Sequence, residues 1–125
     1  MAVTYTTAVK NARLDAVKTA IDAGAAAGKL EIGTASMAST LVTITLNDPS
    51  AAAASGAVLT LSGFPKTVAA AATGTAAAAR VRDSNNVDII TGLTVGTSGS
   101  DINLDSLSIT ASQNVTINSA TITHA

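Results

Sequence analysis

The stretch Arg80 to Leu104, RVRDSNNVDIITGLTVGTSGSDINL, constrains the fold of this chain more than any other part. In residues 77–82 the side chains alternate: Ala77, Ala79 and Val81 form one set, and Ala78, Arg80 and Arg82 form the other. This period of two is typical of a half-buried strand. The next four residues, Asp83-Ser84-Asn85-Asn86, tolerate left-handed backbone and hydrogen-bond to their own main chain, so they favour a hairpin turn. Val87 and Ile89 resume the alternation and predict the second strand of the hairpin.

The second half of this stretch predicts a glycine loop followed by another strand. Gly92, Gly96 and Gly99 punctuate the sequence GLTVGTSGSD and indicate a bend or tight loop that needs positive φ. Beyond it Ile102 and Leu104 are expected to point inward. The polar residues between and beside them, expected to point outward, are Asp101, Asn103 and Asp105.

The N-terminal part contains the one clear helical pattern of the chain. The sequence AVKNARLDAVKTAIDAG predicts an amphipathic helix over residues 8–23, with Thr6 or Thr7 as N-cap and Gly24 just beyond its end. The apolar stripe of this helix, expected to pack on a sheet or alternatively on a partner, comprises Val9, Ala12, Leu14, Ala16, Val17, Ala20 and Ile21. The charged residues assigned to the opposite side are Lys10, Arg13, Asp15, Lys18 and Asp22.

Short alternating segments separated by turn residues fill the rest of the chain. They predict strands at residues 29–34, 41–46, 57–61, 107–110, 115–117 and 120–123, in addition to those of the central stretch. Residues 50–56 are interpreted as a loop, and the alanine-rich residues 68–75 do not favour one structure. We therefore expect a mainly β (α+β) fold, in which the N-terminal helix is followed by a small antiparallel β-sandwich or barrel. We expect the 125 residues to form one domain, with an arm or strand at 1–7, the helix at 8–23 and a β-rich body at 29–125.

Composition excludes several classes of function. The net charge is −1, charged residues make up 12% and aromatic residues 2%, which argues against nucleic-acid binding. The chain has no cysteine, which removes disulfides and thiol chemistry. It shows no signal peptide and no apolar run of the roughly 20 residues that a membrane helix needs, so we expect synthesis in the cytoplasm and no membrane contact. The core material is mostly small side chains, so help from oligomerisation or lattice contacts is expected.

No residue pattern predicts a catalytic, cofactor or metal site, and we expect no enzyme and no cofactor. His124, the single histidine, stands next to the chain end, which is a poor position for a catalytic imidazole. Asp101, Asn103 and Asp105 have the opening spacing of a calcium loop, but Ser106 and Ser112 replace the glycine and glutamate that such a loop requires. A strand explains these three residues better, although cation binding by them stays open. Asp83 is expected to pair with Arg80 or Arg82.

The chain resembles a family of small structural proteins of tailed-bacteriophage virions, encoded among the head and tail genes. The likeness covers most of the length and rests on the segments TTAVKNARLDAVKTAIDAG, GKLEI, TLVTITLNDPSAAAASG, RVRDSNNVDIITGLTVGTSGSDINL and VTINSATIT. The chain departs from the family where Ala78 and Ala79 precede Arg80 in place of an aromatic residue. It departs again where Asn85-Asn86 replaces an Asp-Gly-like turn, and both changes are compatible with the same hairpin. The resemblance implies a structural role in the virion.

The favoured role is a capsid decoration or cement protein on the virion surface, binding the major capsid protein lattice and itself, with a homotrimer as the favoured assembly. The alternatives are a head–tail connector or tail component, and, from another class, an adhesin or other β-sandwich binding module. An adhesin is disfavoured because sugar platforms need aromatic residues, and only Tyr5 and Phe64 are present. The candidate partner contacts lie in the arm and in the alanine loops 51–54 and 69–72. They are Val3, Tyr5, Ala52, Ala53, Ala70 and Ala71.

Overall fold

The computed structural model describes residues 4–24 and 26–123. Helix α1 spans Thr7–Ile21, and its N-cap is Thr6, whose Oγ1 accepts a hydrogen bond from the Val9 N–H at 3.3 Å. The helix ends at Ile21, and its C-cap Asp22 has φ −88°. Gly24 was expected directly beyond the helix end, but with Asp22 as the C-cap that position belongs to Ala23, and Gly24 does not have positive φ. Instead, a side chain at this position would collide with Ser84 in the β6–β7 turn.

Three of the seven residues of the predicted apolar stripe of α1 contact the core of the body. Leu14 and Ile21 are buried and Val17 packs against the core, whereas Val9, Ala12 and Ala16 are exposed. Asp15 and Asp22, which were assigned to the opposite side of the helix, accept hydrogen bonds from a loop of the body.

Residues 26–123 form eleven strands and one short 3₁₀ turn, η1 (Ala35–Met37). The strands are β1 (Lys29–Gly33), β2 (Thr40–Thr45), β3 (Val58–Thr60), β4 (Lys66–Ala69), β5 (Gly74–Thr75), β6 (Ala78–Arg82), β7 (Asp88–Leu93), β8 (Val95–Gly96), β9 (Ile102–Leu104), β10 (Ser108–Ile109) and β11 (Asn114–Thr123). Residues 50–56 form a loop, as predicted, with only isolated bridges at Ala51 and Ser55.

Two sheets dominate the architecture. The four-stranded sheet has the order β2-β1-β6-β7 and is antiparallel throughout. In the five-stranded sheet β11 pairs with β3 and β4 along one edge and with β9 along the other, and β8 adds to β9 in parallel. A short ladder of β5 with β10 lies at one end. The fold is therefore mainly β, with one N-terminal helix followed by antiparallel sheets, as predicted.

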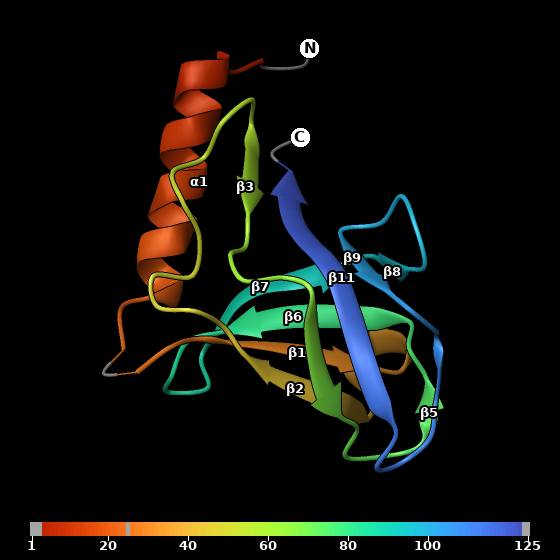
Figure 1. Cartoon of the computed structure of the whole chain (residues 1–125). Helices are drawn as coiled ribbons and strands as arrows, with labels where there is room; N and C mark the ends of the chain where they lie inside the picture. Colours follow the sequence, from red (N-terminus) through yellow and green to blue (C-terminus); the bar gives the residue numbers. More distant parts are fainter. Residues whose placement is uncertain (1–3, 25, 124–125) are drawn as a thin grey trace.

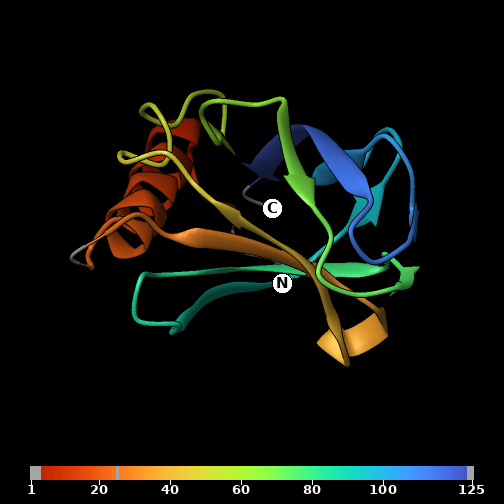
Figure 2. The ribbon, with the colours of Figure 1, turned by 60° about the horizontal axis from the view of Figure 1, so that its bottom comes forward.

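The two sheets form two layers that cross one another, and α1 flanks one side of them (Figures 1 and 2). One apolar cluster lies between the layers, and α1 packs against β3 and β7. Because successive side chains of a strand point to opposite faces, the inner face of β1 is formed by Leu30 and Ile32, which are fully buried. The predicted inward positions Ile102 and Leu104 of β9 are buried as well.

The β6–β7 hairpin is closed by the predicted turn. Asp83 Oδ1 accepts hydrogen bonds from the Asn85 N–H at 2.9 Å and the Val87 N–H at 3.0 Å, and Asn86 has φ 62°. Val87 does not resume the buried alternation as predicted, because it still belongs to the turn and is exposed. Gly92 has φ 75° and lies where the pairing of β7 with β6 shifts register, which is the role that glycine plays in a β-bulge.

Strand β11 is one continuous element where the sequence predicted two. Val115 and Ile117 are buried in its first half, and Ala120 and Ile122 in its second half. The buried positions change from odd to even across a register shift between Ile117 and Ser119. This irregularity interrupts the alternation without ending the strand.

Candidate functional site: the outer face of the four-stranded sheet

The outer face of the four-stranded sheet carries a cluster of charged side chains that we call the arginine face. Its residues point away from the core because they alternate with the buried positions of β1, β2 and β6. They are Lys29 and Glu31 of β1, Thr43 and Thr45 of β2, Arg80 and Arg82 of β6, and Asp88 of β7. Backbone pairing places Glu31 between Thr43 and Arg80, and Arg82 between Lys29 and Asp88.

An ionic network links three strands across this face. Arg80 Nε donates to Glu31 Oε1 at 2.7 Å, and Arg82 Nε lies 3.7 Å from the same oxygen. Arg82 Nε also donates to Asp88 Oδ1 at 2.6 Å. Glu31 is only 8% exposed although it lies on the outer side of the sheet. The expected pairing of Asp83 with Arg80 or Arg82 was wrong, because the Asp83 carboxylate closes the hairpin turn instead.

The two guanidinium groups use only part of their hydrogen-bonding capacity within the chain. A guanidinium carries five N–H donors, and the hydrogen bonds made by Arg80 and Arg82 to the described residues all come from Nε. The side chain of Arg80 is 20% exposed and that of Arg82 is 23% exposed. Both therefore retain terminal donors for a group from outside the chain.

The calcium-like residues are occupied with separate structural tasks. Asp101 Oδ2 accepts from the Thr94 N–H at 3.0 Å, and Asp105 Oδ1 accepts from the Thr116 N–H at 3.3 Å. Asn103 bridges the Ser100 N–H and Ser119 Oγ at 3.0 and 2.9 Å. Within residues 4–24 and 26–123 no three His, Asp or Glu side chains converge to hold a metal ion.

The arm candidates lie at the start of the chain. Val3 lies outside the described residues, and so does His124. Tyr5 is exposed, and the guanidinium of Arg13 stands over its ring, 4.7 Å from the centroid. This geometry is that of a cation–π contact, so the ring is held to the first turns of α1 and still presents surface.

The loop that carries Ala52 and Ala53 is fastened to α1. Three helix side chains accept hydrogen bonds from its backbone: Asp22 from the Ser50 N–H at 3.0 Å, Asp15 from the Ala54 N–H at 2.8 Å, and Asn11 from the Ala57 N–H at 2.9 Å. We call this arrangement the helix clamp. It leaves Ala52 and Ala53 exposed on a fixed loop, where both are available for contact.

The second alanine loop, residues 69–72, is hydrogen-bonded to the β-rich body and is partly buried. Ala70 is buried, so its side chain does not lie where a partner can reach it. Its N–H donates to Gln113 O, and that of Ala71 donates to Leu41 O, both at 2.8 Å. Ala71 itself is exposed. Of this pair, only Ala71 lies on the surface as expected.

The surface of the described residues has no pocket. No helix among them is long and apolar enough to cross a membrane.

The sequence did not predict the arginine face, because Glu31 and Arg80 are 49 residues apart in the chain. The one signal in the sequence was that Arg80 and Arg82 occupy alternate, outward-pointing positions of the predicted strand 77–82.

In comparisons with known proteins, the chain matches no protein-family model, no curated protein and no solved structure.

Proposed function

We propose that this chain is a non-enzymatic structural protein of a tailed-bacteriophage virion that decorates the capsid by binding the major capsid protein lattice. Support comes first from the resemblance of most of the chain to small virion proteins. Support comes also from how the chain uses its ionisable groups. Every acidic side chain of the described residues except Asp48 accepts a hydrogen bond from the chain itself.

This internal use of carboxylates is the observation that supports the non-enzymatic part of the proposal. Catalytic carboxylates must be positioned toward a reacting group, whereas these fix loops, turns and strands. A protein built in this way acts through the surfaces that its fixed loops and sheet faces present. The proposed contacts of the chain are with the capsid lattice and with other copies of itself, in a homotrimer.

Copy number in the particle tests the proposal. Quantitative mass spectrometry of purified virions should give a ratio close to one copy of this chain for each major capsid protein subunit. A handful of copies per particle would move the chain to the head–tail connector or the tail. Absence from virions would overturn a structural role in the particle.

A further inference from the structure

We propose that the arginine face is a binding surface for carboxylate groups of an acidic protein partner. Arg80 and Arg82 would supply the donors. That this partner is the capsid lattice rests on the proposed function, whereas carboxylate recognition by the face follows from the structure of this chain alone.

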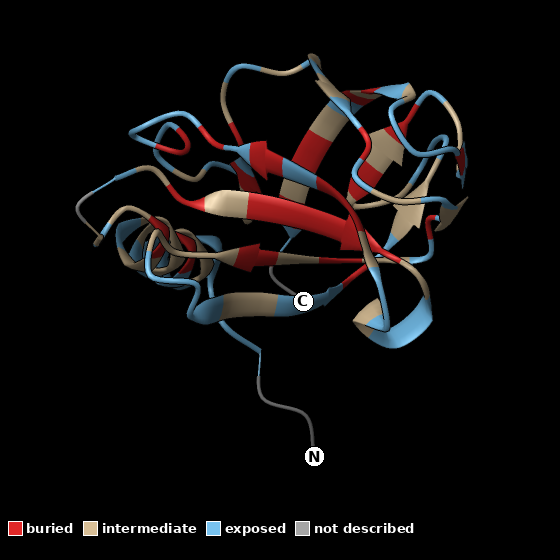
Figure 3. Cartoon of the chain, turned by 90° about the horizontal axis from the view of Figure 1, so that it is seen from below, coloured by how far each residue is buried: buried red, intermediate tan, exposed pale blue. Residues whose placement is uncertain are grey.

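The face is open to a partner. Figure 3 shows the four-stranded sheet from its outer side: η1 lies against the Gly33 end of β1 and β6, and apart from η1 no helix or other strand lies in front of the four strands. Its surface is polar: Thr43 and Thr45 of β2 are exposed beside the charged network. A face of this kind does not offer the apolar core on which hydrophobic interfaces depend. Charge and hydrogen bonding must therefore dominate any contact made there.

The two arginines are fixed before a partner arrives. Glu31 and Asp88 hold both guanidinium groups through their Nε atoms, at 2.7 and 2.6 Å. Side chains ordered in advance lose less conformational freedom on binding. Guanidinium groups bind carboxylates in a forked, two-point geometry through neighbouring N–H groups, and the terminal donors of both arginines have no partner among the described residues.

The charge of the face selects an acidic partner. Lys29, Arg80 and Arg82 outnumber Glu31 and Asp88, so the face is net positive on a chain of net charge −1. Lys29 is held close to the hairpin, with Nζ 3.1 Å from Asn86 Oδ1. A nucleic acid fits less well, because a run of phosphates needs a continuous basic stripe. Here Asp88 borders Arg82 on one side, and Glu31 of β1 borders Arg80 on the other, with the threonines of β2 beyond it.

The first experiment tests carboxylate recognition without any virion. Uniformly ¹⁵N-labelled protein is titrated with poly-L-glutamate, and the Nε–Hε signals of the arginines are followed by NMR. We expect the Arg80 and Arg82 signals to shift until the sites are saturated, and we expect the affinity to fall as the salt concentration is raised. No shift of these signals, or equal shifts with a DNA duplex of the same charge, would overturn the inference.

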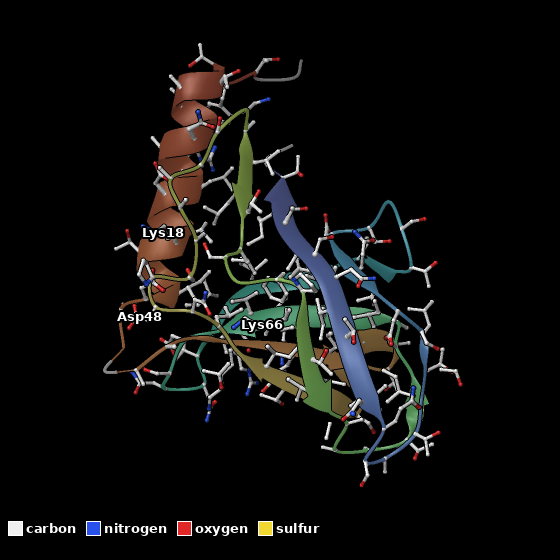
Figure 4. All side chains as sticks on the ribbon, viewed as in Figure 1. Lys18, Asp48 and Lys66 are labelled. Atoms are coloured by element: carbon white, nitrogen blue, oxygen red, sulfur yellow. The ribbon has the colours of Figure 1, made fainter. Side chains whose placement is uncertain are left out.

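Matched variants locate the interaction. Arg80→Lys keeps the charge beside Glu31 but removes the forked donors, and should weaken poly-glutamate binding by about tenfold. Lys18→Gln removes one positive charge from α1 (Figure 4) and should leave the affinity unchanged. Equal losses of affinity in the Arg80 and Lys18 variants would show that binding does not depend on the arginine face, and would overturn the inference.

The second experiment joins the face to the lattice. Virions assembled without this chain are mixed with the wild-type protein, Arg80→Lys or Lys18→Gln, and the bound fraction is measured after sedimentation. We expect the Arg80 variant alone to bind less. If the wild type does not bind, the proposed decoration role fails, and poly-glutamate recognition is judged by the first experiment. If all three proteins bind equally, decoration stands and the lattice is not the partner of this face.

Discussion

Glu31 is a carboxylate buried on the solvent side of a sheet, beneath two arginines that it holds in place. Replacing it with Gln removes the charge but keeps the shape, and leaves Arg80 without its ionic partner at 2.7 Å. We expect Glu31→Gln to lower the free energy of unfolding by about 1–2 kcal/mol, less than for a fully buried ion pair because both arginines are partly exposed. Urea denaturation followed by circular dichroism measures this change.

Asp88→Asn is the matched control, because it alters the same network at a side chain that is 45% exposed. An exposed pair contributes little, so this substitution should cost less than about 0.5 kcal/mol. If the two substitutions lower the free energy of unfolding equally, the burial of Glu31 does not determine how much its ion pair contributes to stability.

At the scale of residues, alternation predicts burial well and polar partners poorly. Ile102 and Leu104 lie inside as their spacing predicts, because the side-chain period of a strand is a local property. The partner of Arg80 depends on which strand pairs with β6, and on the register of that pairing. Neither is encoded near Arg80 in the chain. The sequence therefore favoured the nearest carboxylate, Asp83, which the turn requires for itself.

At the scale of elements, the helix clamp determines how α1 sits on the body. Asp15 Oδ1 accepts the Ala54 N–H at 2.8 Å in a partly buried contact. Asp15→Ala leaves this N–H without its charged acceptor and should lower the free energy of unfolding by about 1–3 kcal/mol. Thermal or urea unfolding measures the loss, and amide exchange at Ala54 should accelerate.

Asp48→Ala provides the control in the same region of the chain. Asp48 is exposed in the segment that leads from β2 into the clamped loop (Figure 4), and its removal should change the free energy of unfolding by less than about 0.5 kcal/mol. An equal loss in the two variants would mean that the clamp does not stabilise the fold.

The existence of α1 was predictable, because its periodicity and its cap are local signals. Its orientation was not, because a polar stripe looks the same whether it faces water or the backbone of a loop. Asp15 and Asp22 were therefore assigned to the solvent side, although they hold the loop 50–57. The sequence predicted two strands in place of the single strand β11 for a related reason. The register shift after Ile117 changes the phase of the apolar alternation, and in the sequence such a change looks like the end of a strand.

At the scale of the whole molecule, one apolar cluster joins α1 and both sheets. It extends from Leu14 of the helix to Ile122 of the last strand, and includes the inner faces of β1, β2, β6, β9 and β11. The general class, a helix followed by antiparallel sheets, was predictable from alternation and turn spacing. The strand order was not predictable, because β11 pairs with β3, β4 and β9, and β3 and β4 lie far from it in the sequence. Such pairings are determined by the packing of the whole chain.

A shared core implies that the helix and the two sheets unfold together. Ile117 is fully buried in β11, opposite Lys66 of β4 and Leu104 of β9. Ile117→Val should lower the free energy of unfolding by about 1 kcal/mol. The helical signal at 222 nm and the Leu104 methyl signal in NMR should move to the same lower midpoint. Val9→Ala, at a half-exposed helix position, should leave both midpoints nearly unchanged. A helical signal that kept the wild-type midpoint in Ile117→Val would show that α1 unfolds independently of the sheets.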